Sequence, residues 1–404
     1  MRERPWLLGA VLAATLAAAA STAAVTRHGA APEKHLGRFR TTAARHHPPK
    51  RRAPRSLEIA AVGDMTFGRA DVLPAGGASR LLAHLRWALH SDVTVGNLET
   101  TLGSGGYSKC PRVHSKTCFA FQAPAGTAGE LRRAGFAAVN VANNHSDDYG
   151  DEGIRETGAA LRSAGLAFTG RPGQITYVVR NGVKVALLGF APYRYDQDLL
   201  DVNGAKQLVR RAAERSDIVI VFIHAGAEGA AYQHVRPGME TYLGELRGDP
   251  LRFAHAVVDA GADVVLGSGP HVLRGMEWYR GRLIAFSLGN FVGYHTLDTS
   301  GVLGASAVLR LRLDEDGSFV AGSLVPLRLD ASGTPSRDAS GDSVGLVSSL
   351  SRADFAQAGV RLSRAGVLLA QRPSSPGRQK SISLSCGLPL SGCSSSAGRH
   401  SPSS

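Results

Sequence analysis

The sequence predicts an α/β protein with two packed sheets and helices on their outer faces. Apolar, strand-like segments alternate regularly with helix-patterned segments between residues 57 and 270. After residue 271 the alternation stops, and several strand-like segments follow one another across short turns. Alternation predicts parallel strands covered by helices, and the later run of strands predicts that the sheets are extended. We therefore expect a four-layer α/β/β/α sandwich.

Five apolar runs have the length and the β-branched content of buried parallel strands. Each run leads directly into residues of the types that bind metal ions. The runs and their polar endings are 57–62 with Asp64, 92–95 with Asn97 and Glu99, 139–142 with Asn143, Asn144 and His145, 218–223 with His224, and 263–266 with His271. Because ligands bind beyond the carboxyl ends of strands in open α/β sheets, these endings predict one Asp/Glu/Asn/His cluster. For Asn143 and Asn144 alone, capping of a helix that begins near Asp151 is the alternative.

The segments between these strands predict the helices and one hairpin. Helices are expected at 81–89, 128–134, 153–164, 207–215 and 250–260. Residues 175–180 and 183–190 flank Asn181-Gly182, which predicts a β-hairpin. Further strands are expected at 275–279, 283–288, 308–313 and 319–327.

The charge of this chain lies at its ends. The formal net charge is +13, while residues 26–56 carry nine Lys/Arg against one Glu and residues 372–404 carry four against none. The region between them is therefore close to neutral, whereas a nucleic-acid-binding fold would carry the excess itself. We expect no nucleic-acid partner. The basic segment predicts a linker lying against an anionic membrane or wall polymer.

Residues 1–25 predict export. A short basic start precedes an almost wholly apolar stretch from Trp6 to Val25, long enough to span a bilayer. The Ala-rich region near its end also fits a cleaved signal peptide, so an anchor and a signal remain alternatives. We expect the folded domain to lie outside the cytoplasmic membrane. The competing expectation is that positive charge after an apolar segment stays inside.

Export gives the cysteines a possible structural role. Cys110 and Cys118 flank a short polar loop after the Glu99 motif and are expected to form a disulfide that stiffens it, with free thiols as the alternative. Zinc binding by these two cysteines is not expected, because their spacing does not match that of a zinc knuckle.

Six motifs, in this order and spacing, resemble those of the bacterial capsule-synthesis CapA family (poly-γ-glutamate synthesis proteins), which is itself similar to the calcineurin-like metallophosphoesterases. The motifs are Val62-Gly63-Asp64, Gly96-Asn97-Leu98-Glu99, Asn143-Asn144-His145 with Asp148-Tyr149-Gly150, His224 to Glu228, Gly267 to Val272, and Ile284 to Phe291. The resemblance covers roughly residues 57 to 370. It implies the sandwich of the metallo-dependent phosphatase type. The expected organisation is then 1–25 signal peptide or membrane anchor, 26–56 flexible basic linker, 57–371 CapA-like metallophosphoesterase-type domain, and 372–404 Ser-rich disordered tail.

The resemblance also implies roles for single residues. Asp64 would bind a metal, and Glu99, with Asn97 as a possible addition, would hold or bridge two. Asn144 and His224 would bind the second metal, and His271 the first. His145 is the candidate catalytic residue, placed to protonate a leaving-group oxygen. One or two divalent ions, among Mn, Fe, Zn and Mg, suit this mixture of oxygen and imidazole ligands.

The chain departs from the phosphoesterase pattern at two motifs. Asp64-Met65-Thr66 stands where those enzymes have Asp-x-His, and Gly267 to His271 stands where they have Gly-His-x-His. Glu228 is either a replacement ligand or a solvated loop charge. Asn290 and Asp148 are further candidates, Asn290 with a purely structural turn as its alternative.

Three functions follow from these observations. The first is a surface protein that binds an anionic capsule polymer or its synthesis machinery and assists export. The second is a metal-dependent hydrolase or transferase acting on another envelope substrate. The third is a generic phosphoesterase, which the export segment argues against.

Overall fold

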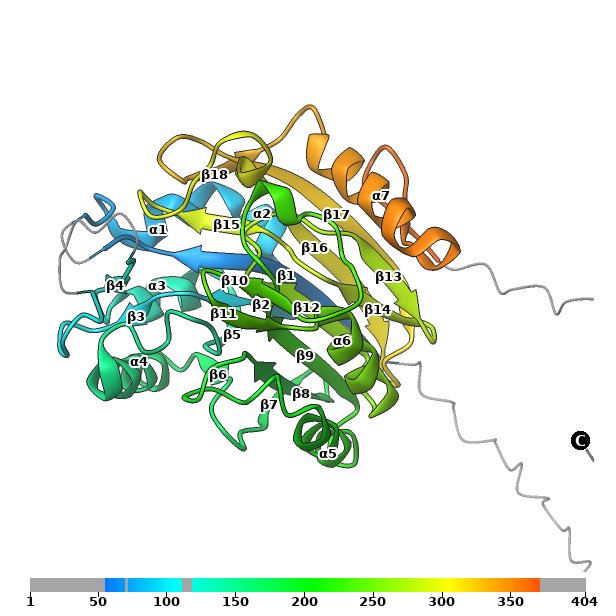
Figure 1. Ribbon diagram of the computed structural model, residues 1–404, viewed down its shortest axis with the longest axis horizontal. Coiled ribbons are helices and arrows are strands. Elements are labelled where there is room, and N and C mark those ends of the chain that lie inside the picture. Colours follow the sequence, from blue (N-terminus) through cyan, green and yellow to red (C-terminus); the bar gives the residue numbers. More distant parts are fainter. Residues whose placement is uncertain (1–54, 70–71, 111–117, 371–404) are drawn as a thin grey trace, which may run out of the picture. The chain divides into compact units, whose positions relative to one another are not determined.

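The computed structural model describes residues 55–69, 72–110 and 118–370 (Figure 1). The segment 1–25, nearly all of the expected linker, and the tail from 372 onward lie outside the described residues, as do Cys386 and Cys393. Within the described ranges, no helix combines the length and the apolar character that a membrane crossing requires.

The first sheet has eight strands, with β1 at its centre. The order is β18-β17-β16-β1-β2-β5-β6, and β15 also pairs with β1. Pairing among β1, β2, β5 and β6 is parallel, whereas β16, β17 and β18 are antiparallel to their neighbours. The strands are β1 (Ser56–Thr66), β2 (Val93–Leu98), β5 (Phe136–Asn140), β6 (Ala167–Thr169), β15 (Asn290–Gly293), β16 (Ala305–Asp314), β17 (Phe319–Leu329) and β18 (Pro335–Arg337).

The second sheet has six strands in the order β13-β14-β12-β9-β8-β7. Its four inner strands are parallel, and the edge strands β7 and β13 run antiparallel to them. The strands are β7 (Thr176–Arg180), β8 (Val183–Phe190), β9 (Ile218–His224), β12 (Val264–Ser268), β13 (Met276–Tyr279) and β14 (Arg282–Ala285). The β7–β8 hairpin confirms the turn expected at Asn181-Gly182.

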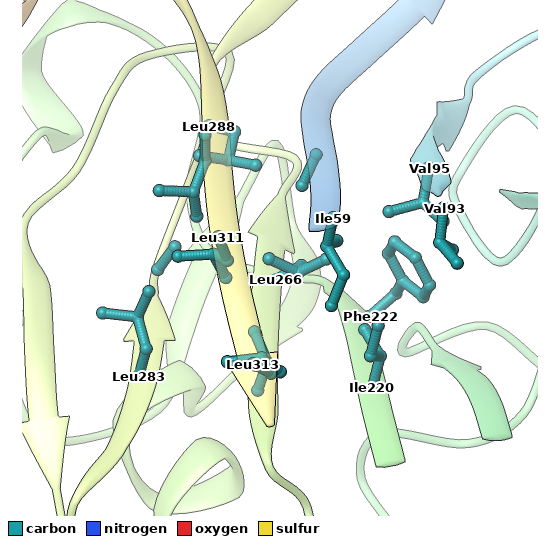
Figure 2. Packing of buried hydrophobic residues seen from close by; sticks show 14 of the residues in the cluster. Ile59, Val93, Val95, Ile220, Phe222, Leu266, Leu283, Leu288, Leu311 and Leu313 are labelled. Carbon is teal, nitrogen blue, oxygen red and sulfur yellow. The ribbon is translucent and has the colours of Figure 1, made fainter. Parts of the chain in front are cut away.

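Alternation along the strands divides the core into three layers. On β1, Ile59 and Ala61 face the second sheet, where they meet residues such as Phe222 and Leu266 (Figure 2). Val62, on the opposite face of β1, packs among residues of the outer helices. This division follows from the two-residue period of a strand, because both faces of each sheet are covered.

Helices cover the outer face of each sheet. The first sheet is covered by α1 (Gly77–Leu82), α2 (Arg86–Leu89), α3 (Thr127–Ala134) and α4 (Gly150–Ser163), and the second by α5 (Val202–Ala213) and α6 (Pro250–Asp259). The expected α/β/β/α sandwich is thus confirmed. The helix expected at 81–89 is interrupted by a 3₁₀ turn, η1 (Ala83–Leu85).

The sequence did not predict the helix α7 (Asp342–Phe355), which lies alongside β13 and β17 (Figure 1). It also did not predict the hairpin of β10 (Glu240–Tyr242) and β11 (Glu245–Gly248), which follows β9. The strand expected at 283–288 ends at Ala285. The remaining short elements are β3 (Thr101–Leu102), β4 (Gln122–Ala123), β19 (Arg361–Leu362), β20 (Leu368–Leu369), η2 (Ala230–Tyr232), η3 (Gly301–Gly304) and η4 (Ala356–Ala358).

Close backbone contact at the end of β1 positions the first polar residue. A Cβ atom at Gly63 would lie 1.9 Å from the carbonyl oxygen of Gly289, so only glycine fits there. The next backbone N–H, that of Asp64, donates to the same carbonyl oxygen at 2.9 Å. The turn before β15 is therefore held against the carboxyl end of β1.

Candidate metal centre

Two carboxylates and two imidazoles meet where the two sheets present their strand ends. Asp64 lies at the end of β1 and Glu99 directly after β2, both in the first sheet. His224 ends β9, and His271 follows β12, both in the second sheet. One ligand atom each from Asp64, Glu99 and His224 lies within 4.8 Å of the other two.

Glu99 lies between the two imidazoles. Its Oε1 is 3.7 Å from His224 Nε2 and also 3.7 Å from His271 Nε2. The side chain is fully buried, yet neither carboxylate oxygen has a hydrogen-bond partner among the described residues. Because buried polar atoms are normally paired, this pair of oxygens fits the ligand set of a cation.

His224 offers one nitrogen to the same space. Its Nδ1 lies 3.2 Å from Ser268 Oγ and also 3.2 Å from Asn97 Nδ2, while Nε2 is buried without a hydrogen-bond partner in the described part of the chain. In the tautomer that carries its proton on Nδ1 and donates to Ser268, the lone pair of Nε2 is free for a metal. Full burial of the ring keeps it in this orientation.

His271 is held by partners beside its Nδ1 atom. This nitrogen lies 2.9 Å from Asn290 Oδ1 and 3.2 Å from Asp64 Oδ2. The residue has a φ of 58°, a conformation that side chains other than glycine adopt rarely and that concentrates at functional sites. The Asn290 amide nitrogen faces the carbonyl oxygens of Asp298 and Leu303, so its oxygen is directed at the imidazole.

Glu228 is not a solvated loop charge. Its side chain is only 18% exposed, and Arg247, which is 2% exposed, binds one of its oxygens. The other oxygen lies 3.9 Å from His271 Nε2. The β10–β11 hairpin supplies Arg247 and thereby brings this third carboxylate to the edge of the cluster.

A chain of side-chain amides supports the cluster from the first sheet. Asn97 donates from Nδ2 to Asp64 Oδ1 at 2.8 Å, and its Oδ1 accepts from Asn140 at 2.9 Å and from Asn143 at 3.2 Å. With its oxygen engaged in this way, Asn97 orients Asp64 instead of presenting a free ligand atom.

Asn143 also donates to the Leu98 carbonyl oxygen, and α4 begins only at Gly150. The alternative that Asn143 caps this helix is therefore wrong.

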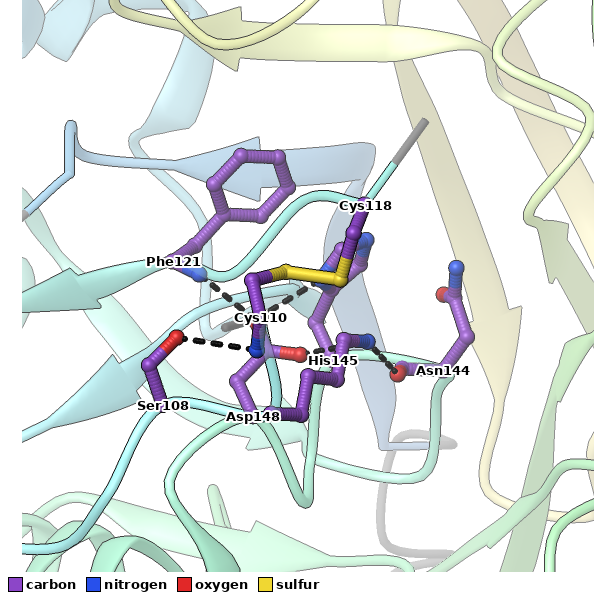
Figure 3. Close-up of a disulfide and its surroundings, with 8 residues drawn as sticks. Ser108, Cys110, Cys118, Phe121, Asn144, His145 and Asp148 are labelled. Atoms are coloured by element: carbon purple, nitrogen blue, oxygen red, sulfur yellow. Dashed lines mark hydrogen bonds and ion pairs between the residues drawn. A yellow bond between two sulfur atoms is a disulfide. The ribbon is translucent and has the colours of Figure 1, made fainter. Parts of the chain in front are cut away.

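Asn144 and His145 lie in the loop after β5. Asn144 Oδ1 is buried and has no hydrogen-bond partner in the described residues. His145 Nδ1 lies 2.8 Å from Asp148 Oδ2, and the imidazole contacts the Phe121 ring at a centroid distance of 4.3 Å (Figure 3). Asp148 is therefore a partner of His145. Burial lowers the pKa of His145, and the Asp148 carboxylate opposes this shift.

The expected disulfide between Cys110 and Cys118 is present beside this loop, with a Cα–Cα distance of 5.6 Å (Figure 3). Free thiols, the alternative, are excluded. Phe119 and Phe121, which come shortly after Cys118, line the cavity above the cluster.

That cavity has a volume of about 250 Å³ and contains His145, Glu228, His271 and Asn290 in its wall. Its apolar side is formed by Phe119, Phe121, Tyr242, Leu297 and Leu303. A ligand in this cavity would touch the imidazoles of His145 and His271 at the same time.

The cluster has strongly shifted pKa values. Burial would raise the pKa of Asp64, but His271 and His224 outweigh it and lower the pKa to about 2. Burial and the Asp64 charge raise the pKa of Glu99 well above its usual range. Burial disfavours charge on His271, yet Glu99, Asp64 and Glu228 together raise its pKa to about 10. Burial lowers the pKa of His224 well below its usual range, against the opposing effect of Asp64. A bound cation would favour the deprotonated form of Glu99 and of His271, the two groups whose pKa is raised.

Several residues of the site were not assigned from the sequence. Asn140 and Asn143 lay within a motif, but amide-to-amide contacts across strands have no signal in one sequence. Arg247 and Lys109 come close to the site only through the tertiary fold. A single basic residue in a sequence does not indicate which distant residues it will contact.

A family model for the bacterial capsule synthesis protein PGA_cap matches residues 58–295, which is more than half of the chain. The capsule biosynthesis protein CapA of Bacillus anthracis is 29% identical over 304 residues, covering 70% of each chain. The PGA biosynthesis protein CapA of Bacillus subtilis (strain 168) is 29% identical over 265 residues, 58% of this chain and 63% of that protein. Among solved structures, a 5'-nucleotidase precursor from Thermus thermophilus aligns with a TM-score of 0.39 and 13% identity, over 68% of this chain and 54% of that one.

Proposed function

The chain belongs to the family of bacterial capsule synthesis proteins, and from that membership we propose that it is a metal-binding protein of the cell surface that acts on an anionic capsule polymer. Poly-γ-glutamate is the polymer that the family resemblance suggests. The partner is the polymer or the machinery that makes it. The match to the Bacillus subtilis relative spans less than two thirds of that protein, so the activity of the whole relative is part of this proposal.

The observation that carries the proposal is the buried Glu99 carboxylate, whose two oxygens have no hydrogen-bond partner among the described residues. It faces His224 and His271 at 3.7 Å in each case. Carboxylate oxygen and imidazole nitrogen together suit Mn, Fe, Zn or Mg. Asp64, Glu99, Asn144, His224 and His271 would hold one or two such ions, with Glu228 at the edge.

A divalent metal supplies Lewis acidity toward phosphoryl or carbonyl oxygens and lowers the pKa of bound water. The protein supports this chemistry in three ways. Asn97 and Asn290 orient Asp64 and His271. His145 lies in the cavity wall with its Nδ1 beside Asp148, so its other ring nitrogen, Nε2, would be the atom that exchanges a proton with a ligand. The apolar side chains that form one side of the cavity would lower the polarity around a bound ligand.

Hydrolysis or transfer on another envelope substrate is the second candidate function. It is favoured by His145, whose hydrogen bond to Asp148 resembles the arrangement of a general acid with its orienting carboxylate. A protein that only bound polymer would not require this pair.

We place the domain outside the cytoplasmic membrane, with residues 1–25 as a signal peptide or anchor and residues 26–56 as a linker. The apolar start and the basic linker support this location, and a flexible linker of this length reaches roughly 30 Å. Protease added to intact protoplasts is expected to digest the domain. Full protection of the domain would overturn the surface location.

The metal role is tested on the purified full chain. Mass spectrometry is expected to find one or two divalent ions per chain in the wild type and none in Glu99→Gln. Turnover of a generic phosphodiester and retention on immobilised poly-γ-glutamate then separate the two functions. A wild-type protein without metal, and without affinity for metal, would refute the proposal.

A further inference from the structure

We propose that Lys109 is a positioning residue that holds Asn144 and the His145–Asp148 pair in place, and that the Cys110–Cys118 disulfide keeps Lys109 where it does so. The inference rests on the proposed metal-binding role of Asn144. It adds a residue and a covalent bond to the site, neither of which contacts the metal cluster.

Lys109 contacts both ends of the loop that carries the two functional side chains. Its Nζ donates to the carbonyl oxygen of Asn144 at 3.0 Å and lies 2.6 Å from Asp148 Oδ1. Its backbone N–H donates to the carbonyl oxygen of Asp148 at 2.8 Å. Three contacts from one residue therefore close the segment 144–148 into a ring that includes His145.

The other end of the disulfide loop binds the same carboxylate. The backbone N–H of Phe121 donates to Asp148 Oδ2 at 2.6 Å, and the Phe121 ring packs against His145 (Figure 3). Asp148 Oδ1 thus faces the Lys109 ammonium group. Asp148 Oδ2 accepts the hydrogen bond from the Phe121 backbone and faces His145 Nδ1. Cys110 directly follows Lys109, and Cys118 comes three residues before Phe121. The disulfide between the two cysteines therefore limits how far Lys109 and Phe121 can move apart.

The buried charge of Asp148 explains why a cationic side chain is needed at position 109. Asp148 is fully buried, and burying a charged group is costly unless it is paired with an opposite charge or with hydrogen-bond donors. Lys109 is half-exposed, so its ammonium group keeps part of its hydration while neutralising Asp148. A methionine would keep the apolar stem and remove both polar contacts, whereas an arginine would retain the charge.

If Asn144 binds the metal as proposed, its contact with Lys109 would link this arrangement to the metal cluster. Asn144 Oδ1 is buried without a hydrogen-bond partner in the described residues, so its direction depends on how its backbone is held. Besides Lys109, Tyr195 contacts the same carbonyl oxygen through its hydroxyl at 3.4 Å, a longer distance. Groups that orient ligands from outside typically alter metal affinity by about 10- to 100-fold when they are removed.

The test uses the full chain, with Mn²⁺ as the probe, and compares Lys109→Met with Lys109→Arg. Lys184→Met is the matched control, because Lys184 lies on β8 and its ammonium contacts the Tyr177 ring. In calorimetry, Lys109→Met is expected to weaken Mn²⁺ binding about tenfold or more, and Lys109→Arg is expected to recover most of the loss. The electron paramagnetic resonance spectrum of bound Mn²⁺ should change only in Lys109→Met.

Hydrogen exchange of the metal-free protein provides a readout that does not depend on metal. Amides of residues 144–148 are expected to exchange about tenfold faster in Lys109→Met, with those of β9 unchanged. The double variant Cys110→Ser/Cys118→Ser should act in the same direction. Combined with Lys109→Met it should add little, because both changes release the same contacts.

The outcomes separate the two proposals. A wild type that binds none of Mn²⁺, Fe²⁺, Zn²⁺ and Mg²⁺ removes the metal role, while exchange at 144–148 still decides whether Lys109 holds the loop. Wild-type Mn²⁺ affinity and wild-type exchange in Lys109→Met would overturn the inference. Full additivity with the cysteine variant would overturn the part assigned to the disulfide.

Discussion

Replacing Glu99 with glutamine is expected to stabilise the metal-free protein and to abolish its stabilisation by metal. The metal-free wild type buries a carboxyl group with two unpaired oxygens among the described residues. Each unsatisfied buried polar atom costs about 1–3 kcal/mol. The glutamine amide can donate toward His224 Nε2, which lies 3.7 Å from the present Oε1. We expect the metal-free variant to gain about 1–3 kcal/mol at pH 8.

The sign of the pH dependence follows from the raised pKa of Glu99, which burial and Asp64 cause. A carboxyl group whose pKa is higher in the folded state contributes stability below its unfolded pKa and loses it as pH rises through the folded value. The advantage of Glu99→Gln over the wild type should therefore grow with pH from about 4.5 upward. If the difference in unfolding free energy between Glu99→Gln and the wild type did not change with pH, the raised pKa of Glu99 would be contradicted.

Thermal denaturation with and without Mn²⁺ measures both effects. At a metal concentration about 100 times the dissociation constant, binding stabilises the wild type by about 2.7 kcal/mol, and Glu99→Gln should show almost none of this shift. Glu277→Gln is the control. Glu277 is also buried, but it lies outside the cluster, and its Oε2 is 2.7 Å from His255 Nε2. This control should lose stability and keep the metal shift. An unchanged metal shift in Glu99→Gln would refute the reasoning.

Three further predictions concern the same site. His145→Ala should keep its metal, measured by mass spectrometry, and lower phosphodiester turnover by about 10²- to 10⁴-fold; loss of metal would make His145 a ligand instead. Metal affinity should rise with pH, because Glu99 and His271, whose pKa values are raised, must release protons on binding. Calorimetry in two buffers of different ionisation enthalpy counts those protons, and a count of zero would contradict this. Gly63→Ala should destabilise the protein by about 1–3 kcal/mol in urea and weaken metal binding, because the new methyl group would push the turn that holds Asp64; wild-type stability would disprove the close contact.

The layered fold could be predicted from the sequence because its signals are local. The apolar runs that became β9 and β12 have the length and the β-branched content of buried strands, and the segment that became α6 has the apolar period of a helix. Elements without such a local sequence signal were not predicted. The β10–β11 hairpin has exposed apolar residues and turns at Leu243, whose φ is 49°, a conformation that leucine rarely adopts.

The cluster itself could be predicted only as a set of residue types at one edge. Strand ends indicated Asp64, His224 and His271, because parallel strands carry their carboxyl ends to the same side. The sequence did not indicate that Asn97 would orient Asp64, or that Arg247 would fold back on Glu228. Such contacts depend on side-chain directions and on loops, which a single sequence does not specify.

The division of the ligands between the two sheets has a mechanical consequence. Asp64 and Glu99 belong to one sheet, and His224 and His271 to the other. A cation bound by all four would act as a cross-link between β layers that otherwise adhere mainly through apolar contacts such as that of Phe222. The distance between the layers, set by core side chains that never touch the ion, would then tune its affinity. Conversely, loading the ion would resist sliding of one sheet over the other.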